Sequence, residues 1–313
     1  PFFPIIYVRG YAMTEREQDE TTADPFCGFN LGSTVYRATP DKTKPAKKFV
    51  FESPVLRLMS DFGYAAVYDN GLDILDGEWE GSLSLRSIVI YRYYEQASAL
   101  LGSGKTPDIS QFARGLSDLV LRVRDLACAN PENRLAPEDF RCHLVAHSMG
   151  GLVTRHALAG EGGEALAAKV LGVVHGAQPV HGAPDAYHRA IAGTGAEGIL
   201  GRIASEVLGP DGPHMTAIIP HAPGVLQLLP NQFYRTNKGE KAWLHIQDLD
   251  DPEKFTSYPE NDPYEEIYAK SHHRDFWGLI HGEWFQPHAE DGATIEKAFR
   301  GENTGGTGGG EPS

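Results

Sequence analysis

The chain has 313 residues, 41% of them hydrophobic, and its 28 Lys and Arg set against 42 Asp and Glu give a net charge of −14. This length and composition suit one large α/β domain with insertions, or two smaller domains. An acidic surface argues against binding to nucleic acid, because contact with a phosphate backbone needs clustered Lys and Arg. It leaves transient contact with a membrane surface open.

The sequence shows no targeting segment. No apolar stretch approaches the roughly 20 residues of a membrane span. Residues 1–4 lack the basic region and long apolar run of a signal peptide. We therefore expect a cytoplasmic chain, or one exported by a route that needs no signal peptide. The first residues already have the pattern of a core strand, so we expect the chain to be cut from a longer protein. This expectation leaves truncation at both ends open.

In the first part of the chain, the hydrophobic pattern predicts two strands and one long helix. Residues 4–8 and 87–94 are apolar, β-rich runs of strand length. Asp108 predicts the start of the helix, with Gln111 as its capping-box partner and apolar residues at three-four spacing as far as residue 126. Residues 13–81 have no strong period, so we expect a long insertion there.

Further strands are predicted at residues 141–146 and 169–174, with a helix between them that Gly160 ends. The alternation predicts a mostly parallel central sheet with right-handed crossovers and helices on both faces. After Gln178 the alternation breaks. The remaining predictions are a weak strand at 242–246, helical segments at 191–208, 263–268, 273–285 and 294–299, and a Gly-rich tail or linker at 301–313.

The run Ala146-His147-Ser148-Met149-Gly150-Gly151 joins an apolar strand directly to a helix. This order of strand, tight turn and helix is typical of a nucleophile elbow, where a strained backbone presents a serine hydroxyl at the tip of the turn. The residues two before and two after the serine pass close to neighbouring backbone, so they must be small. Gly150 meets this requirement, and Ala146 differs by one methyl group from the more usual glycine. The pattern predicts that Ser148 is a nucleophile.

A serine nucleophile also needs backbone N–H donors for the negative oxygen that forms during its attack. One donor is the N–H of the residue after the nucleophile, here Met149, and a second comes from the loop after an early strand. Arg9-Gly10-Tyr11 follows the predicted strand at residues 4–8. We therefore expect Tyr11 to supply the second N–H of the oxyanion hole.

The serine hydroxyl further needs a histidine base that a carboxylate orients, and the expected chain order is serine, acid, histidine. Asp248 is the predicted acid because it follows the strand candidate at residues 242–246. His288 is the predicted base. The alternatives are Asp250 or Asp251 for the acid and His281 for the base, or positions beyond residue 313 for both.

No metal or organic cofactor is expected. His175, His181 and His188 are close in sequence, but their spacing fits no common zinc pattern, and we expect their loop to line the site instead. The cysteines at positions 27, 128 and 142 also lack metal-ligand spacing. Cys142 lies in the strand before the elbow, where we expect a buried thiol.

On these residues the chain resembles the α/β-hydrolase superfamily of lipases and esterases. The segments that carry this likeness are residues 4–11, 87–94, 108–126 and 141–174. The stretches H-G-A-Q-P-V-H-G-A-P-D-A-Y-H-R at 175–189, A-P-G-V-L-Q-L-L-P-N at 222–231 and D-P-Y-E-E-I-Y at 262–268 are similar to bacterial lipase-like proteins that include type VI secretion phospholipase effectors. A more distant likeness is to lecithin:cholesterol acyltransferase and inositol-deacylase-like lipases.

The resemblance implies an α/β-hydrolase domain over residues 1–300, with the insertion at 13–81 and a lid-like or cap-like insertion at 179–268. It implies hydrolysis of a lipid-type carboxylic ester, as by a lipase or phospholipase, through an acyl-enzyme on Ser148. An acyltransferase would use the same acyl-enzyme. A non-catalytic binding module with a hydrolase fold and an amidase or peptidase are further alternatives.

Overall fold

The computed structural model describes residues 2–10, 34–37, 47–50, 54–67, 74, 81–91, 93, 107–192, 223–248 and 250–269. The chain divides into two compact units. Unit 1 comprises residues 1–102 and 107–179, and unit 2 comprises residues 103–106 and 180–313. The cap-like insertion expected at residues 179–268 stays a prediction.

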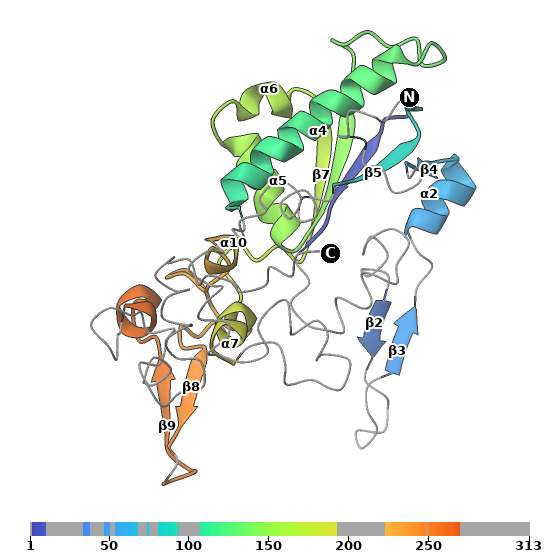
Figure 1. Cartoon of the computed structure of the whole chain (residues 1–313). Coiled ribbons are helices and arrows are strands. Elements are labelled where there is room, and N and C mark those ends of the chain that lie inside the picture. The colour runs from blue at the N-terminus through green and yellow to red at the C-terminus, as the bar shows by residue number, and fades with distance from the viewer. Residues whose placement is uncertain are drawn as a thin grey trace, which may run out of the picture. The chain divides into compact units, whose positions relative to one another are not determined.

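Unit 1 is built on a parallel sheet, five-stranded within the described residues. Figure 1 shows its strands beside the long helix α4 (Ile109–Ala129). The α/β class that the alternation predicts is therefore confirmed. In order across the sheet the strands are β4 (Ala65–Ala66), β5 (Ser87–Tyr91), β1 (Ile5–Val8), β6 (Cys142–His147) and β7 (Val170–Gly176).

The core of unit 1 lies on both faces of this sheet. Side chains alternate between the faces of a strand. Cys142, Leu144 and Ala146 on one face of β6 are buried, whereas the residues between them are half-buried. On the opposite face, Ile5 and Ile88 form a buried cluster with Tyr64. Partly buried hydrophobic side chains from α2 (Pro54–Phe62) and from β6 pack against this cluster.

Helix α4 (Ile109–Ala129) begins as the sequence predicts. The Asp108 side chain caps it by accepting a 2.9 Å hydrogen bond from the backbone N–H of Gln111. One face of α4 is a stripe of buried, mostly apolar side chains. Fully burying one Val, Leu, Ile or Phe side chain contributes about 1.5–3 kcal/mol, so this stripe holds the helix in place. The buried residues of the stripe are Ile109, Phe112, Ala113, Leu116, Leu119, Val120, Val123, Leu126 and Ala127.

Two helices follow β6. Helix α5 (Met149–Ala159) packs on α4, β1 and β6, and α6 (Gly163–Ala167) packs on α5 and β7. The N–H of Gly160 donates to the carbonyl of His156 at 2.8 Å, which ends α5 at the glycine that the sequence marks.

The segment at residues 13–81 also contributes to the central sheet. It contains the antiparallel pair β2 (Thr34–Arg37) and β3 (Lys47–Val50), helix α2 (Pro54–Phe62) and strand β4. Strand β4 pairs with β5 in parallel, Ala65 beside Ser87. Gly63, at φ +67°, ends α2 in the left-handed conformation that glycine adopts most easily. A strand of two residues offers no alternation to read, which is why the sequence pattern does not reveal it.

Unit 2 contains helices α7 (Pro184–Ala192) and α10 (Pro223–Leu226), the antiparallel hairpin of β8 (Leu244–Gln247) and β9 (Phe255–Tyr258), and the π-helical turn η3 (Tyr264–Tyr268). The strand predicted at 242–246 corresponds to β8, and the helical segment predicted at 263–268 corresponds to η3. The helices predicted at 273–285 and 294–299, most of the one at 191–208, and the tail at 301–313 lie outside the described residues.

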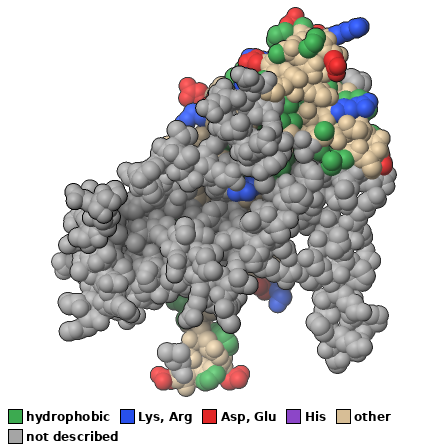
Figure 2. Space-filling view, turned by 45° about the vertical axis from the view of Figure 1, so that its right-hand side comes forward, with side chains coloured by type: hydrophobic (Ala, Val, Ile, Leu, Met, Phe, Trp, Pro, Cys, Tyr) green, Lys and Arg blue, Asp and Glu red, His purple; other side chains and the backbone are tan. Residues whose placement is uncertain are grey.

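Where Figure 2 shows described residues, acidic, basic and hydrophobic side chains lie among other side chains and backbone. Within the described part of the chain, no helix is both long enough and apolar enough to cross a membrane. Cys142 is fully buried, and its burial raises the pKa of the thiol to about 12, so the expectation of a buried thiol is confirmed.

Candidate active site

Ser148 occupies a strained turn between β6 and α5. Its backbone lies at φ 53°, ψ −127°. A non-glycine residue at positive φ costs about 1–3 kcal/mol and persists only where the surrounding structure holds it. The strand and the helix both lie in the packed core of unit 1, so they fix the two ends of this turn. The tight turn that the sequence predicts is present.

The Ser148 hydroxyl is not used to stabilise the helix that follows it. A serine at this N-terminal position normally accepts a hydrogen bond from a backbone N–H of the first helical turn. Ser148 makes no such cap bond, and the residue is half-buried. Its hydroxyl is therefore held at the turn without a role in capping.

The loop after β1 passes directly beside Ser148. Val8 and Ala146 are partners in the parallel register of β1 and β6, so two residues further on Gly10 is level with Ser148. A Cβ on Gly10 would lie 2.5 Å from the Cβ of Ser148 and 3.1 Å from Nδ1 of His147. Only glycine fits at position 10, and the loop backbone can therefore approach the serine closely.

Gly150 is required for the same close approach from the side of the helix. A Cβ on Gly150 would collide with the carbonyl oxygens of Val8 and Arg9. The small residue that the elbow pattern demands two positions after the serine is thus explained by the backbone of the loop after β1.

Strand β7 lies on the other side of the elbow. The N–H of Ser148 donates to the carbonyl oxygen of Gly176 at 2.9 Å. The next residue, Ala177, is also strained, at φ 48°. Gln178 then packs over the helix start, where a Cβ on Gly151 would lie 2.8 Å from Cγ of Gln178. Its side-chain nitrogen is buried, and no hydrogen-bond partner for it exists among the described residues.

Of the two predicted oxyanion donors, one can be placed. Met149 is the first residue of α5 and is 2% exposed. Backbone N–H groups in the first turn of a helix point out of its N-terminal end, where the helix dipole favours negative charge. Tyr11 lies outside the described residues, which end at Gly10 on this loop.

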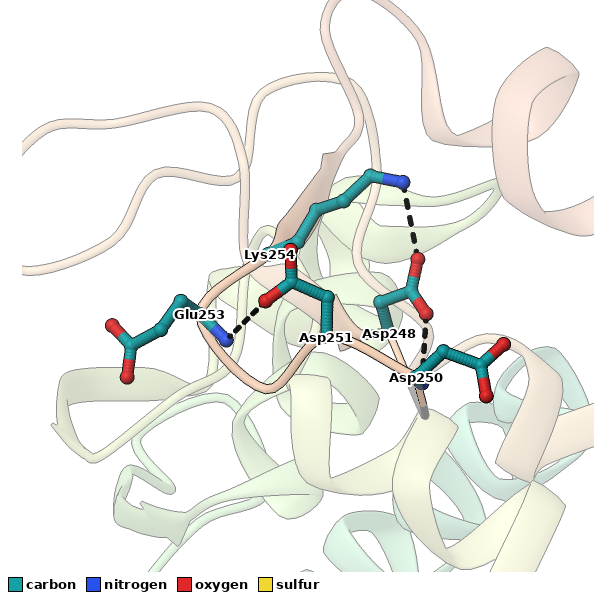
Figure 3. Close-up of polar contacts among 5 residues, drawn as sticks. All are labelled: Asp248, Asp250, Asp251, Glu253 and Lys254. Carbon is teal, nitrogen blue, oxygen red and sulfur yellow. Dashed lines mark hydrogen bonds and ion pairs between the residues drawn. The ribbon is translucent and has the colours of Figure 1, made fainter.

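The predicted acid, Asp248, follows β8 in the loop of the hairpin in unit 2. Figure 3 shows its carboxylate accepting from the N–H of Asp250 at 3.0 Å and from Nζ of Lys254 at 3.1 Å. The backbone hydrogen bond first, and then Lys254, hold the pKa of this carboxyl below its usual value. Both oxygens thus have partners within the loop, and these contacts stabilise the hairpin turn.

The alternatives for the acid lie in the same loop. Asp251 accepts from the N–H of Glu253 at 3.2 Å, and Asp250 is exposed. His288 and His281, the candidates for the base, lie outside the described residues. The assignments of acid and base therefore stay predictions.

The clustered histidines of the sequence end up in different elements. His175 is in β7 of unit 1, His188 is in α7 of unit 2, and both are exposed. Among the described residues, no three His, Cys, Asp or Glu side chains are arranged to hold a metal ion. We expect the loop that carries these histidines to line the site. The start of this loop supports the expectation, because Gly176 and Gln178 lie beside the elbow.

One buried residue at the site has no recognisable signal in the sequence. Tyr93, just after β5, donates its hydroxyl hydrogen to the carbonyl oxygen of Arg9 at 2.9 Å. The sequence shows only a Tyr-rich strand end, and nothing in it indicates that this side chain reaches a loop 84 positions earlier.

Comparisons with known proteins add one likeness. No protein-family model matches the chain, and no curated protein matches it in sequence. The chain is similar to one in the crystal structure of the Tle4–Tli4 complex, at 22% sequence identity and a TM-score of 0.45, over 98% of this chain and 68% of that one. A likeness at this level does not establish a shared fold, so the evidence for function lies in the residues of the site.

Proposed function

We propose that the chain is a serine ester hydrolase with Ser148 as its nucleophile. The observation that carries the proposal is the conformation of Ser148, a non-glycine residue at φ 53° whose hydroxyl makes no cap bond. A serine with only a structural role at a helix start does not need a strained backbone. A nucleophile does need it, because the strained turn presents the hydroxyl away from the strand and the helix. The close approach of Gly10 adds backbone beside the same residue.

In this proposal the Ser148 oxygen attacks the ester carbonyl carbon, and a histidine takes the hydroxyl proton. The negative oxygen is held by the N–H of Met149 and by a second N–H, proposed for Tyr11. The histidine then protonates the leaving alcohol, which gives the acyl-enzyme, and water releases the acid by the same route. His288 and Asp248 are the proposed base and acid, with His281, Asp250 and Asp251 as alternatives.

The proposed substrate is a lipid-type carboxylic ester. Support comes from the resemblance of residues 175–189 and 222–231 to lipase-like proteins. Two apolar stretches of the sequence, 218–219 and 225–229, are candidates for contact with an acyl chain. The first lies outside the described residues, and in the second Leu228 is 2% exposed and belongs to the core of unit 2.

Labelling with a fluorophosphonate, which reacts with activated serines, tests the nucleophile directly. We expect the full chain to be labelled and to release p-nitrophenol from p-nitrophenyl butyrate, and we expect Ser148→Ala to lose both activities. Ser60→Ala is the control, because Ser60 is exposed on α2 and its hydroxyl donates to the carboxylate of its neighbour Asp61. It should react like the unaltered chain.

Labelling that survives in Ser148→Ala would contradict the proposal. A folded chain that is neither labelled nor active would favour the non-catalytic binding module. If the serine is labelled, product analysis with an added acceptor alcohol separates the hydrolase from an acyltransferase, because only the transferase forms the new ester as its main product.

A further inference from the structure

Tyr93 is held rigidly in the core of unit 1. Its side chain is 1% exposed. Its ring packs against Phe112 of α4 at 4.6 Å between centroids and against Tyr91 of β5 at 5.3 Å. Because two aromatic rings from the sheet and the helix fix the position of the third, its hydroxyl occupies a defined point. At that point it donates to the carbonyl oxygen of Arg9 at 2.9 Å.

The Arg9 carbonyl belongs to the peptide bond that leads into Gly10. A trans peptide is planar, so a hydrogen bond that fixes the Arg9 carbonyl also fixes the plane of the Gly10 amide. Gly10 in turn lies against Ser148, where a Cβ would come within 2.5 Å of the serine Cβ. A rotation of this one peptide would therefore change the distance between the loop and the nucleophile.

The same carbonyl is confined on a second side. A Cβ on Gly150, in the first turn of α5, would collide with the oxygens of Val8 and Arg9. Helix α5 thus limits how far the loop can move toward the elbow. The Tyr93 hydroxyl adds an attraction that holds the loop, through a hydrogen bond in a partly buried place.

We propose that Tyr93 is a positioning residue for the oxyanion loop, defined as Val8-Arg9-Gly10. Its hydroxyl sets the Arg9–Gly10 peptide beside Ser148, without touching the substrate. This inference rests on the proposed function, because the loop has a catalytic role only if Ser148 attacks an ester. Displacing a catalytic group by about 1 Å reduces rates about 100-fold, so partial release of the loop should have a smaller effect.

Tyr91 provides a matched control in the same aromatic cluster. It is 2% exposed, and its hydroxyl donates to the carbonyl oxygen of Phe112 in α4 at 2.8 Å. Tyr91→Phe and Tyr93→Phe each remove one buried hydroxyl bonded to a backbone carbonyl and keep the ring. Both variants should lose a similar amount of thermal stability, but only Tyr93→Phe releases the oxyanion loop.

The test is steady-state kinetics of the full chain with p-nitrophenyl butyrate, at a temperature where melting curves show both variants folded. We expect Tyr93→Phe to lower kcat about 10-fold with KM within about two-fold, because a displaced oxyanion donor weakens transition-state more than ground-state binding. Tyr91→Phe should keep kcat within about two-fold. Equal kcat values for the two variants, or a change confined to KM, would overturn the proposal.

A second measurement separates this proposal from the function on which it rests. In ¹H–¹⁵N spectra of the labelled chain, the Gly10 amide resonance should shift in Tyr93→Phe and remain unchanged in Tyr91→Phe. If the unaltered chain shows no serine-dependent hydrolysis, the proposed function fails while a shifted Gly10 amide still supports the positioning. If the chain is active and the Gly10 amide is unmoved in Tyr93→Phe, the positioning role is wrong.

Discussion

Ser148 combines a hydroxyl that chemistry requires with a backbone conformation that stability disfavours. Replacement by alanine removes the hydroxyl and keeps the strain at φ 53°, whereas replacement by glycine removes both. Release of the strain gains about 1–3 kcal/mol. The extra freedom of glycine in the unfolded chain offsets about 0.5–1 kcal/mol of that gain. We therefore expect Ser148→Gly to be more stable than Ser148→Ala by about 1 kcal/mol.

Urea unfolding of the two variants measures this difference. Ala177→Gly provides a comparison, because Ala177 has φ 48° and no hydroxyl, and it should also gain stability. Identical midpoints for Ser148→Gly and Ser148→Ala would mean that the strain in the turn only matches the roughly 0.5–1 kcal/mol cost of glycine in the unfolded chain. That is less than the strain on which the argument for a nucleophile at this position depends.

Gly10 is the second residue whose identity the site dictates, because a side chain there would have no space. In Gly10→Ala the new methyl group would lie 2.5 Å from the Cβ of Ser148, so the loop or the elbow must shift. A shift of about 1 Å is expected to reduce kcat about 100-fold. Gly172→Ala is the control, because the nearest atom to its Cβ would be 3.8 Å away. Full activity in Gly10→Ala, measured with p-nitrophenyl butyrate, would contradict the close approach.

At the scale of elements, the start of α4 depends on the charge of its cap. The Asp108 carboxylate accepts from the Ser110 hydroxyl and from the Gln111 N–H, at 2.6 and 2.9 Å. These hydrogen bonds, with Ser110 the larger cause, lower the pKa of Asp108 in the folded chain. A carboxyl with a lowered pKa contributes stability above its unfolded pKa of about 3.9 and loses that contribution as the pH falls through the folded value.

We therefore expect Asp108→Ala to cost about 1 kcal/mol of unfolding free energy at pH 7. The difference from the unaltered chain should shrink as the pH falls below about 4. Urea unfolding at pH 7 and pH 3.5 checks this. Asp118→Ala, at an exposed position in the middle of the same helix, should cost less than the cap at pH 7. A cost for Asp108→Ala that is the same at both pH values would show that the charge of the cap has no role.

The elements that the sequence predicts correctly are those whose signal is strong and local. Helix α4 has an apolar stripe over many turns and a capping aspartate, and β6 runs straight into a turn of small residues. Helix α7 was missed because the buried residues of its described part, Ala186 and Ala190, are too small to stand out as an apolar period. Strand β4 was missed because it depends on its pairing with β5 and not on its own two residues.

At the scale of the whole molecule, the candidate site also has parts with a local signal in the sequence and parts that depend on distant contacts. The elbow can be predicted because its strand, serine and glycines are consecutive in sequence. The loop at Gly10 can be proposed from its place after the first strand, but its close approach to Ser148 becomes visible only through the register of β1 and β6. Tyr93 becomes recognisable only through a contact across 84 positions. An acid and a base come from distant segments that need no fixed local motif, so single carboxylates and histidines cannot be told apart by pattern. Asp248 illustrates this, because its hairpin loop gives it partners of its own.

Net charge also acts at the scale of the molecule. With −14 formal charges, the chain should be repelled by anionic membrane surfaces. If the proposed lipid-type ester is the substrate, hydrolysis in phosphatidylglycerol vesicles should be slow at low ionic strength. It should rise as salt shortens the screening length from about 30 Å at 0.01 M to about 8 Å at 0.15 M.

Hydrolysis in phosphatidylcholine vesicles, whose surface carries no net charge, should change little over the same range of ionic strength. Hydrolysis of p-nitrophenyl butyrate in solution serves as a control for salt effects on the chemistry itself. A rate on anionic vesicles that falls with salt would mean that a local basic surface outweighs the net charge and docks the chain on the membrane. The sign of the salt dependence therefore decides whether the acidic composition governs the encounter with the lipid.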